Sequence, residues 1–142
     1  MALPRVLFLC IGNSCRSQMA EGYARTYGRD VMVPVSAGLA PAASVSPLTV
    51  KVMKEKNIDL EGAVPKGIDE VLKDGPADLI VNITCRTLPF GVSVPVEDWR
   101  VRDPMGEKES VFREVASDIE NRVMRLVLSM RSQQTSPARR PG

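Results

Sequence analysis

Three residues near the start of the chain have the types and spacing needed to hold and attack a tetrahedral oxyanion. Cys10 is followed, after five intervening residues, by Arg16 and Ser17. A guanidinium can bind two oxygens of one anion, and a serine hydroxyl can donate a hydrogen bond to a thiolate. The spacing therefore predicts a single loop in which Cys10 is the nucleophile, Arg16 binds the anion and Ser17 stabilises the sulfur.

The sequence around these residues has the pattern of a strand, a tight loop and a helix. Residues 6–9 are apolar, as in a buried strand, and a helical pattern begins at Gln18. Gly12 and Asn13 tolerate positive φ, which a loop wrapped around an anion requires. The loop amides and the helix N-terminus would bind an anion and favour a Cys10 thiolate. The residues predicted to surround the oxyanion are Ile11, Gly12, Asn13, Ser14, Cys15 and Arg16.

A purely structural role for Cys10 is less compatible with this segment. On its own, a cysteine at the end of a buried strand is more often a small hydrophobic core residue. The combination of Cys10 with Gly12, Asn13, Arg16 and Ser17 at this spacing favours the nucleophile instead. The loop also lacks the Gly-Lys-Ser/Thr of a Walker motif and does not match a dinucleotide-binding fingerprint.

The composition of the chain limits its chemistry. Its 142 residues suit one domain, and a net charge of +2 gives no indication of a nucleic-acid or membrane partner. There is no histidine, which excludes histidine-based nucleophile activation and histidine-ligated zinc, so we expect Asp or Glu as any general acid. Three cysteines do not suggest a secreted disulfide framework, and there is no long apolar segment or leader. We therefore expect a cytoplasmic protein.

The rest of the chain alternates between expected strands and helices. The expected strands are residues 6–9, 31–35, 79–83 and 92–96, and the expected helices are residues 18–27, 47–56, 68–73 and 107–131. This order predicts a three-layer α/β fold, a four-stranded parallel sheet with helices on both faces. Pro34 suggests that its strand lies at an edge. We expect one domain over residues 1–131 and a disordered tail over residues 132–142.

The expected sheet also predicts which distant residues meet. Ligands of such sheets bind at the carboxyl ends of the strands. Cys10 and Cys85 each follow an expected strand. The two cysteines could therefore be neighbours across one site.

The loop resembles that of a known family. The run FLCIGNSCRSQMAEG is similar to the phosphate loop of the low-molecular-weight protein tyrosine phosphatase superfamily, and NSCRSQMAEG is most similar to the arsenate reductases of that fold. The resemblance covers roughly residues 4–131 and implies the flavodoxin-like fold of that family. It also implies that Asp103, in an Asp-Pro pair before the last helix, is the general acid.

The residues after Asp103 depart from the phosphotyrosine enzymes. Those enzymes place aromatic residues after the Asp-Pro pair to hold a phenyl ring, whereas Met105 and Gly106 follow Pro104 here. Aromatic residues make up only 4% of the chain, which favours a small oxyanion as substrate.

The resemblance to arsenate reductases also implies further thiols. Cys85 matches the second cysteine of the thioredoxin-linked enzymes, but the position of their third cysteine is Val92. Either Cys85 or Cys15 could release the adduct on Cys10 by forming a disulfide, or an external thiol could do so. The external reductant would be glutathione, mycothiol, glutaredoxin or thioredoxin, and no bound cofactor is expected.

Some members of the family bind a potassium ion beside the loop. Three of the corresponding positions are present as Asn13, Glu21 and Ser36, and the fourth is Lys66 in a gapless alignment. An ammonium group could take the place of the ion, so we expect no metal.

Three functions remain open. The first is an arsenate reductase-like enzyme, active in arsenic resistance. The second is a phosphatase that hydrolyses phosphotyrosine or aryl phosphates through a cysteinyl-phosphate. The third is a non-catalytic module that binds anions or senses redox state. In each case we expect a monomer.

Overall fold

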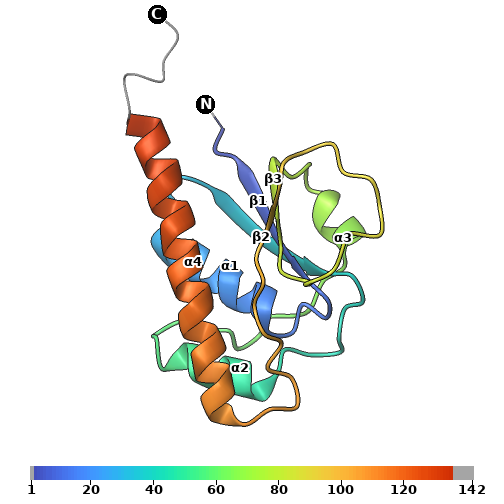
Figure 1. The fold of residues 1–142 in the computed structure, drawn as a ribbon, viewed down its shortest axis with the longest axis vertical. Helices are drawn as coiled ribbons and strands as arrows, with labels where there is room; N and C mark the ends of the chain where they lie inside the picture. Colours follow the sequence, from blue (N-terminus) through green and yellow to red (C-terminus); the bar gives the residue numbers. More distant parts are fainter. Residues whose placement is uncertain (1, 136–142) are drawn as a thin grey trace, which may run out of the picture.

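The apolar run near the N-terminus forms an inner strand of a parallel sheet, as predicted. In the computed structural model, which describes residues 2–135, β1 (Arg5–Cys10) pairs with β2 (Val33–Gly38) on one side and with β3 (Leu79–Asn82) on the other. The strand β4 (Val96–Asp98) completes the order β2-β1-β3-β4, in which every pairing is parallel. Figure 1 labels β2, β1 and β3 of this sheet side by side. Pro34 therefore lies in an edge strand, where its missing N–H leaves no inner ladder bond unmade.

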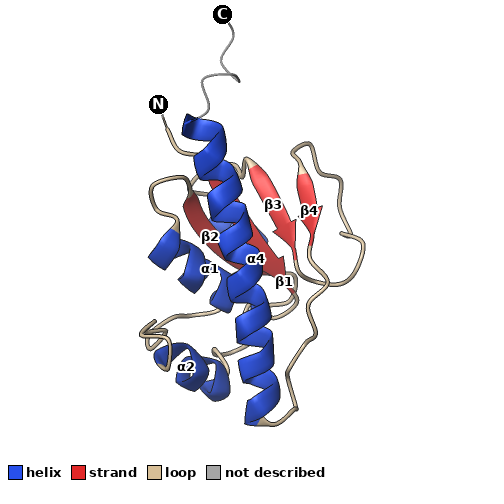
Figure 2. Ribbon diagram, turned by 60° about the vertical axis from the view of Figure 1, so that its left-hand side comes forward, coloured by secondary structure: helices blue, strands red, loops and turns tan. Residues whose placement is uncertain are grey.

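Helices cover both faces of this sheet, which confirms the predicted three-layer α/β fold. On one face, α1 (Arg16–Tyr27) and α4 (Glu109–Thr135) pack against each other, and α2 (Pro47–Lys54) packs against α4 (Figure 2). The short helix α3 (Ile68–Leu72) lies on the other face, beside β2.

The side chains of β1 alternate between two cores. Val6 and Phe8 join the larger core beneath α1 and α4, whereas Leu7 and Leu9 join a smaller core with Val71 of α3. Both cores are buried, so the strand is apolar along its whole length rather than alternating in polarity.

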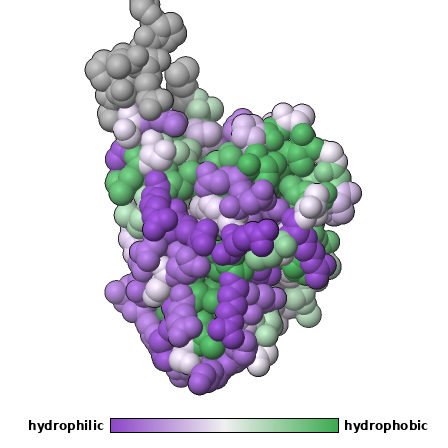
Figure 3. Space-filling view, viewed as in Figure 1, coloured by the Kyte–Doolittle hydropathy of each residue, from purple (hydrophilic) through white to green (hydrophobic). Residues whose placement is uncertain are grey.

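The second face is covered more thinly. Between β3 and β4 there is no helix, and Leu88, Val92 and Val94 of the connection pack on the smaller core instead. Leu72 and Phe90 are 37% and 39% exposed on this side, and Figure 3 shows hydrophobic surface near α3 and the connection after β3.

Several boundaries differ from the expected ones. The last strand is Val96–Asp98 rather than residues 92–96, because Val92 and Val94 pack against the smaller core instead of pairing with β3. The helix α4 continues to Thr135, so residues 132–135 of the expected tail are helical. Residues 136–142 of that tail lie outside the described residues.

Candidate active site at the carboxyl end of β1

The loop between β1 and α1 is held from behind by the segment that follows β2. Its carbonyl groups accept hydrogen bonds of 2.8 to 3.0 Å from backbone amides, from Leu39 to Cys10, Ala40 to Ile11, Ala42 to Gly12 and Ser46 to Ser14. By contrast, no N–H of residues 11–16 donates a backbone hydrogen bond within the described part of the chain. These N–H groups are therefore available to an anion, together with the N-terminus of α1.

Gly38 allows this close backing. A Cβ at this position would lie 2.7 Å from the carbonyl oxygen of Ile11 and 2.8 Å from the amide nitrogen of Asn13. Both are backbone atoms, which cannot turn away as a side chain can. The sequence indicated only that a strand ends here, so it missed the role of Gly38 in shaping the loop.

Asn13 fastens the loop from within. Its backbone is left-handed, with φ at 50°, as its residue type suggested. Its Nδ2 donates to Ser17 Oγ at 2.8 Å and to Ser36 Oγ at 3.0 Å, and its Oδ1 accepts from the backbone N–H of Lys66 at 2.8 Å. The side chain of Asn13 is thus used in bracing the loop.

A directed chain of hydrogen bonds reaches the sulfur of Cys10. Ser17 Oγ lies 2.8 Å from Cys10 Sγ, and both side chains are almost wholly buried. Because Ser17 Oγ already accepts a hydrogen bond from Asn13, its own hydrogen is free to point at the sulfur. The hydroxyl of Ser17 is therefore placed to donate a hydrogen bond to the sulfur of Cys10.

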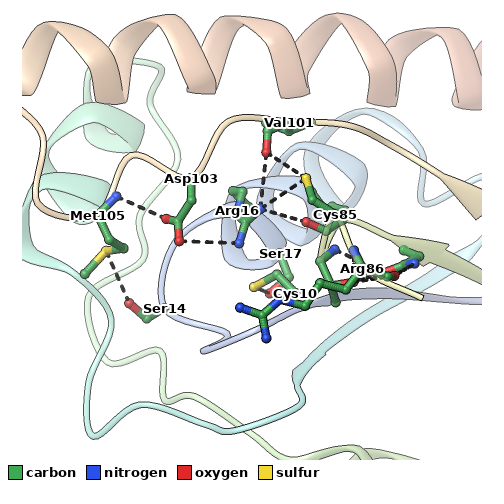
Figure 4. A network of polar contacts seen from close by, with 12 residues as sticks. Cys10, Ser14, Arg16, Ser17, Cys85, Arg86, Val101, Asp103 and Met105 are labelled. Atoms are coloured by element: carbon green, nitrogen blue, oxygen red, sulfur yellow. Dashed lines mark hydrogen bonds and ion pairs between the residues drawn. The ribbon is translucent and has the colours of Figure 1, made fainter. Parts of the chain in front are cut away.

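Arg16 lies over the loop and is buried, with 4% of the residue exposed. Its Nη1 donates to the carbonyl oxygens of Ile83 at 2.8 Å and Val101 at 3.2 Å. Figure 4 shows Arg16 between Asp103, Cys85 and Cys10. Two of its donors are thus used to orient it, and no sequence pattern pointed to the carbonyl groups that do so.

Asp103 lies at the open side of the site. Its Oδ2 is 3.6 Å from Arg16 Nη2, and its Oδ1 accepts a hydrogen bond from the backbone N–H of Met105 at 3.1 Å. The side chain is 51% exposed. A cavity of about 420 Å³, lined by Arg16, Cys85 and Asp103, opens here. A carboxyl group in this position can pass a proton to a ligand held by Arg16.

The structure brings Cys85 to the site, as the sheet topology predicted. Its Sγ lies 3.8 Å from Arg16 Nη1 and donates to the carbonyl oxygen of Val101 at 3.4 Å. The residue is exposed and has a φ of 62°, an uncommon backbone conformation for cysteine.

Cys15 is placed differently. Its thiol is buried at the start of α1, and this burial raises its pKa to about 12. The nearby sulfur of Cys10 acts in the same direction, whereas the Thr49 hydroxyl opposes it. The thiol of Cys15 therefore stays protonated at neutral pH and is a poor nucleophile.

The expected neighbour of the loop, Lys66, contacts it through its backbone. The residue is half-buried, and its ammonium group donates to the carbonyl oxygen of Val64 at 3.3 Å. Ser36 Oγ donates to Glu21 Oε1 at 2.5 Å. Over residues 2–135, no group of three or more His, Cys, Asp or Glu side chains is arranged to hold a metal ion. Within the same residues, no helix is long and apolar enough to cross a membrane.

Comparison with known proteins agrees with this geometry. A family model described as "Low molecular weight phosphotyrosine protein phosphatase" matches residues 5–136. The glutaredoxin arsenate reductase of Synechocystis sp. is 35% identical over 133 residues, covering 88% of this chain and 97% of that protein. Arsenate reductase 1 of Bacillus cereus is 40% identical over 124 residues, covering 83% and 90%. A solved structure described as an arsenate reductase in the phosphate binding state gives a TM-score of 0.80 at 33% identity, covering 90% of this chain and 99% of that chain.

Proposed function

The chain belongs to the low-molecular-weight phosphotyrosine protein phosphatase family of cysteine-dependent enzymes, and we propose that it acts as a thiol-linked arsenate reductase. The observation that carries this proposal is the position of Cys85, whose sulfur lies 3.8 Å from the guanidinium of Arg16. A phosphatase needs one sulfur at its oxyanion site, whereas a reductase needs a second sulfur that can reach the first. The similar proteins named as arsenate reductases support the same function.

In the first step, the thiolate of Cys10 attacks the arsenic atom of arsenate. An S–As bond forms and the bond from arsenic to one of its hydroxyl groups breaks, while a proton from Asp103 converts the departing hydroxyl group to water. The free amides of residues 11–16 and the guanidinium of Arg16 stabilise the charge on the remaining oxygens. The hydroxyl of Ser17, 2.8 Å from the attacking sulfur, donates a hydrogen bond to it.

In the second step, Cys85 releases the product. Its thiolate attacks the sulfur of Cys10, the S–As bond breaks, and the electron pair of that bond goes to arsenic, which leaves as arsenite. Cys10 and Cys85 are left joined as a disulfide. Cys15 is the weaker candidate for this step, because its buried thiol has a pKa of about 12.

An external thiol must then reduce the disulfide. The relative in Synechocystis sp. is named a glutaredoxin arsenate reductase, which supports glutathione with glutaredoxin as the reducing system here. Such a cycle requires a reducing compartment and so supports a cytoplasmic location. The chemistry needs the residues of one chain, which is compatible with a monomer.

The test is to incubate the protein with arsenate and less than one equivalent of thiol, measure the arsenite released, and map disulfides by mass spectrometry. We expect a Cys10–Cys85 disulfide in the parent protein and in Cys15→Ala. We expect Cys85→Ser to lose arsenate reduction while keeping slow hydrolysis of p-nitrophenyl phosphate. We expect Asp103→Asn to lower the rate of both reactions by about 100-fold or more.

Three results would contradict this proposal. A disulfide between Cys10 and Cys15 would show that Cys15, and not Cys85, performs the second step. Hydrolysis of phosphoesters without any release of arsenite would show that the protein is a phosphatase and not an arsenate reductase. Anion binding in Cys10→Ser, with no turnover of either substrate by the parent protein, would leave a non-catalytic module.

A further inference from the structure

The proposed catalytic cycle needs an external thiol, and no binding site for that thiol has been described so far. The chain has three cysteines, and Val92 stands where a third thiol of a relay would be. Cys15 is buried and protonated at neutral pH. Resolution of the Cys10–Cys85 disulfide must therefore begin with a thiol from outside the chain.

That external thiol has one accessible target. Cys10 is 2% exposed, whereas Cys85 is exposed. Attack on Cys85 also makes Cys10 the leaving group, and its thiolate is stabilised by the hydroxyl of Ser17, 2.8 Å away. The approach to Cys85 is thus the place to look for recognition of the reductant.

A second cavity adjoins Cys85 on the side away from Asp103. It measures about 480 Å³, within the range of small-molecule sites. Its walls include Cys85, Arg86, Arg100 and Asp98, with Trp99 and Phe90 among its apolar residues. Arg86 and Arg100 also line the mouth of the catalytic cavity, so the two cavities meet at these residues and Cys85.

The charges in this second cavity are available to a ligand. Within the described chain, Arg86 and Arg100 form hydrogen bonds through their backbone atoms. The carbonyl oxygen of Arg86 accepts from Asn82, and that of Arg100 accepts from Arg122. Their exposed guanidinium groups therefore have no ion-pair partner among residues 2–135. Asp98 supplies one carboxylate, which accepts from Asn82 at 2.9 Å. The cavity thus offers two unpaired cations and one anion.

From this pattern we propose that the cavity beside Cys85 binds a small peptide thiol with two carboxylates and one ammonium group, the charge pattern of glutathione. Arg86 and Arg100 take the carboxylates, Asp98 takes the ammonium group, and the thiol faces Cys85. The bound thiolate attacks Cys85, the S–S bond breaks, and its electron pair returns to Cys10. A thiol of glutaredoxin, or a second molecule of the ligand, then attacks the ligand's sulfur in the mixed disulfide. This attack gives a disulfide between the ligand and the attacking thiol and returns the Cys85 thiolate. The catalytic role rests on the proposed function, but the binding site does not.

The site can be tested without arsenate. In Cys10→Ser, Cys85 is treated with glutathione disulfide or with the neutral bis(2-hydroxyethyl) disulfide, and formation of the mixed disulfide is followed by mass spectrometry. We expect glutathione disulfide to react about tenfold faster than the neutral disulfide at low salt, because the paired charges raise its local concentration. The difference should shrink in 1 M NaCl.

Substitutions then locate the effect. Arg86→Ala with Arg100→Ala, added to Cys10→Ser, should remove the preference for glutathione disulfide and leave the rate with the neutral disulfide within about twofold. Arg86→Glu with Arg100→Glu should instead prefer cystamine, a disulfide with two ammonium groups. The control is Arg29→Ala, which removes one positive charge from an exposed residue just after α1. It should keep the preference.

Three results would overturn the proposal. The first is an unchanged preference for glutathione disulfide after both arginines are replaced, and the second is an equal loss in Arg29→Ala, which would make the effect one of net charge. If the double substitution raises only the KM for arsenate with dithiothreitol, the arginines serve entry of the oxyanion and the thiol site is rejected. Absence of arsenate turnover with every thiol would reject the reductase instead, while leaving the disulfide-exchange result standing.

Discussion

At the scale of single residues, the site depends on the direction of its hydrogen bonds. Asn13 donates to Ser17, and this leaves the hydrogen of the Ser17 hydroxyl available to the sulfur of Cys10. The sequence predicted Cys10, Arg16 and Ser17 from their spacing alone, because a short loop brings them together whatever the rest of the chain does. It could not predict that the carbonyl groups of residues 83 and 101 orient Arg16, since any residue type supplies a carbonyl oxygen.

Gly38 provides a test at this scale. In Gly38→Ala the new methyl group would press on the backbone of Ile11 and Asn13, so the loop must move away from β2. We expect a loss of about 1 to 3 kcal/mol in the free energy of unfolding, as for other overpacked sites, and a larger loss of phosphate affinity. Urea unfolding and calorimetric titration with phosphate measure the two effects.

The matched control is Gly91→Ala, because a Cβ at Gly91 meets no atom within 4 Å. Phosphate binding in Gly38→Ala at the affinity of the parent protein would show that the loop tolerates the methyl group. The need for glycine arises from the register that places Cys10 opposite Gly38, two residues far apart in sequence, and is not visible in the sequence around either.

At the scale of elements, α4 is joined to the rest of the fold by ion pairs as well as by its apolar stripe. Arg131 pairs with Asp30 at 2.8 Å and Arg113 with Glu55 at 2.8 Å. The two arginines hold the pKa values of Asp30 and Glu55 below their ordinary values of 3.8 and 4.5.

The lowered pKa values of Asp30 and Glu55 make the free energy of unfolding depend on pH. A carboxyl whose pKa is lower in the folded state stabilises the fold above the unfolded pKa, and this contribution is lost as the pH falls through the folded pKa. We therefore expect the free energy of unfolding to fall on acidification below about pH 4.5. Arg113→Gln should make this fall shallower, measured by urea unfolding between pH 7 and pH 3.

Arg125→Gln, which removes an exposed arginine of the same helix, is the control and should keep the steeper dependence. Equal slopes in the two variants would mean that the ion pairs of Arg113 are too well screened by solvent to matter, a real alternative for exposed pairs.

The prediction of elements succeeded where burial is strong and failed at the sheet edge. The strands β1 and β3 are apolar runs, and the structure confirms them close to the expected positions. The strand β4 has only three residues, all exposed, and its place depends on pairing with β3. The apolar residues within 92–96 suggested a strand there, but Val92 and Val94 serve the thin second core.

At the scale of the whole molecule, the site lacks a slot for an aromatic ring. Trp99 is 5% exposed and packs on Phe8, with ring centroids 5.9 Å apart, so it is used in the core. Met105, which is 51% exposed, stands beside Asp103 where a ring-binding residue is expected in a phosphotyrosine enzyme. The fold thus leaves the mouth of the catalytic cavity open to small anions.

This absence predicts poor use of aryl phosphates. We expect p-nitrophenyl phosphate to be hydrolysed with a high KM, and Met105→Tyr to lower that KM several-fold, because an aromatic side chain would stack on the ring of the substrate at about 0.5–1.5 kcal/mol. Steady-state kinetics with p-nitrophenyl phosphate measure the change. Phe90→Tyr, which alters an aromatic residue away from Asp103, should leave the KM unchanged. An equal KM in Met105→Tyr and the parent protein would show that the ring binds elsewhere.

The backing of the loop by residues 39–46 has a consequence for discrimination between phosphate and arsenate. The carbonyl groups of the loop already accept hydrogen bonds from residues 39–46, so the N–H groups of residues 11–16 are in place before any anion binds. These N–H groups select an anion only by its tetrahedral shape and its negative charge. Phosphate meets both conditions as well as arsenate does and should occupy the loop as a reversible competitor. Selection then falls to reactivity, since a bound arsenic(V) atom can accept two electrons from a pair of thiols whereas phosphorus(V) cannot. The rate at which a cell detoxifies arsenate through this protein should therefore follow the ratio of arsenate to phosphate rather than the concentration of arsenate alone.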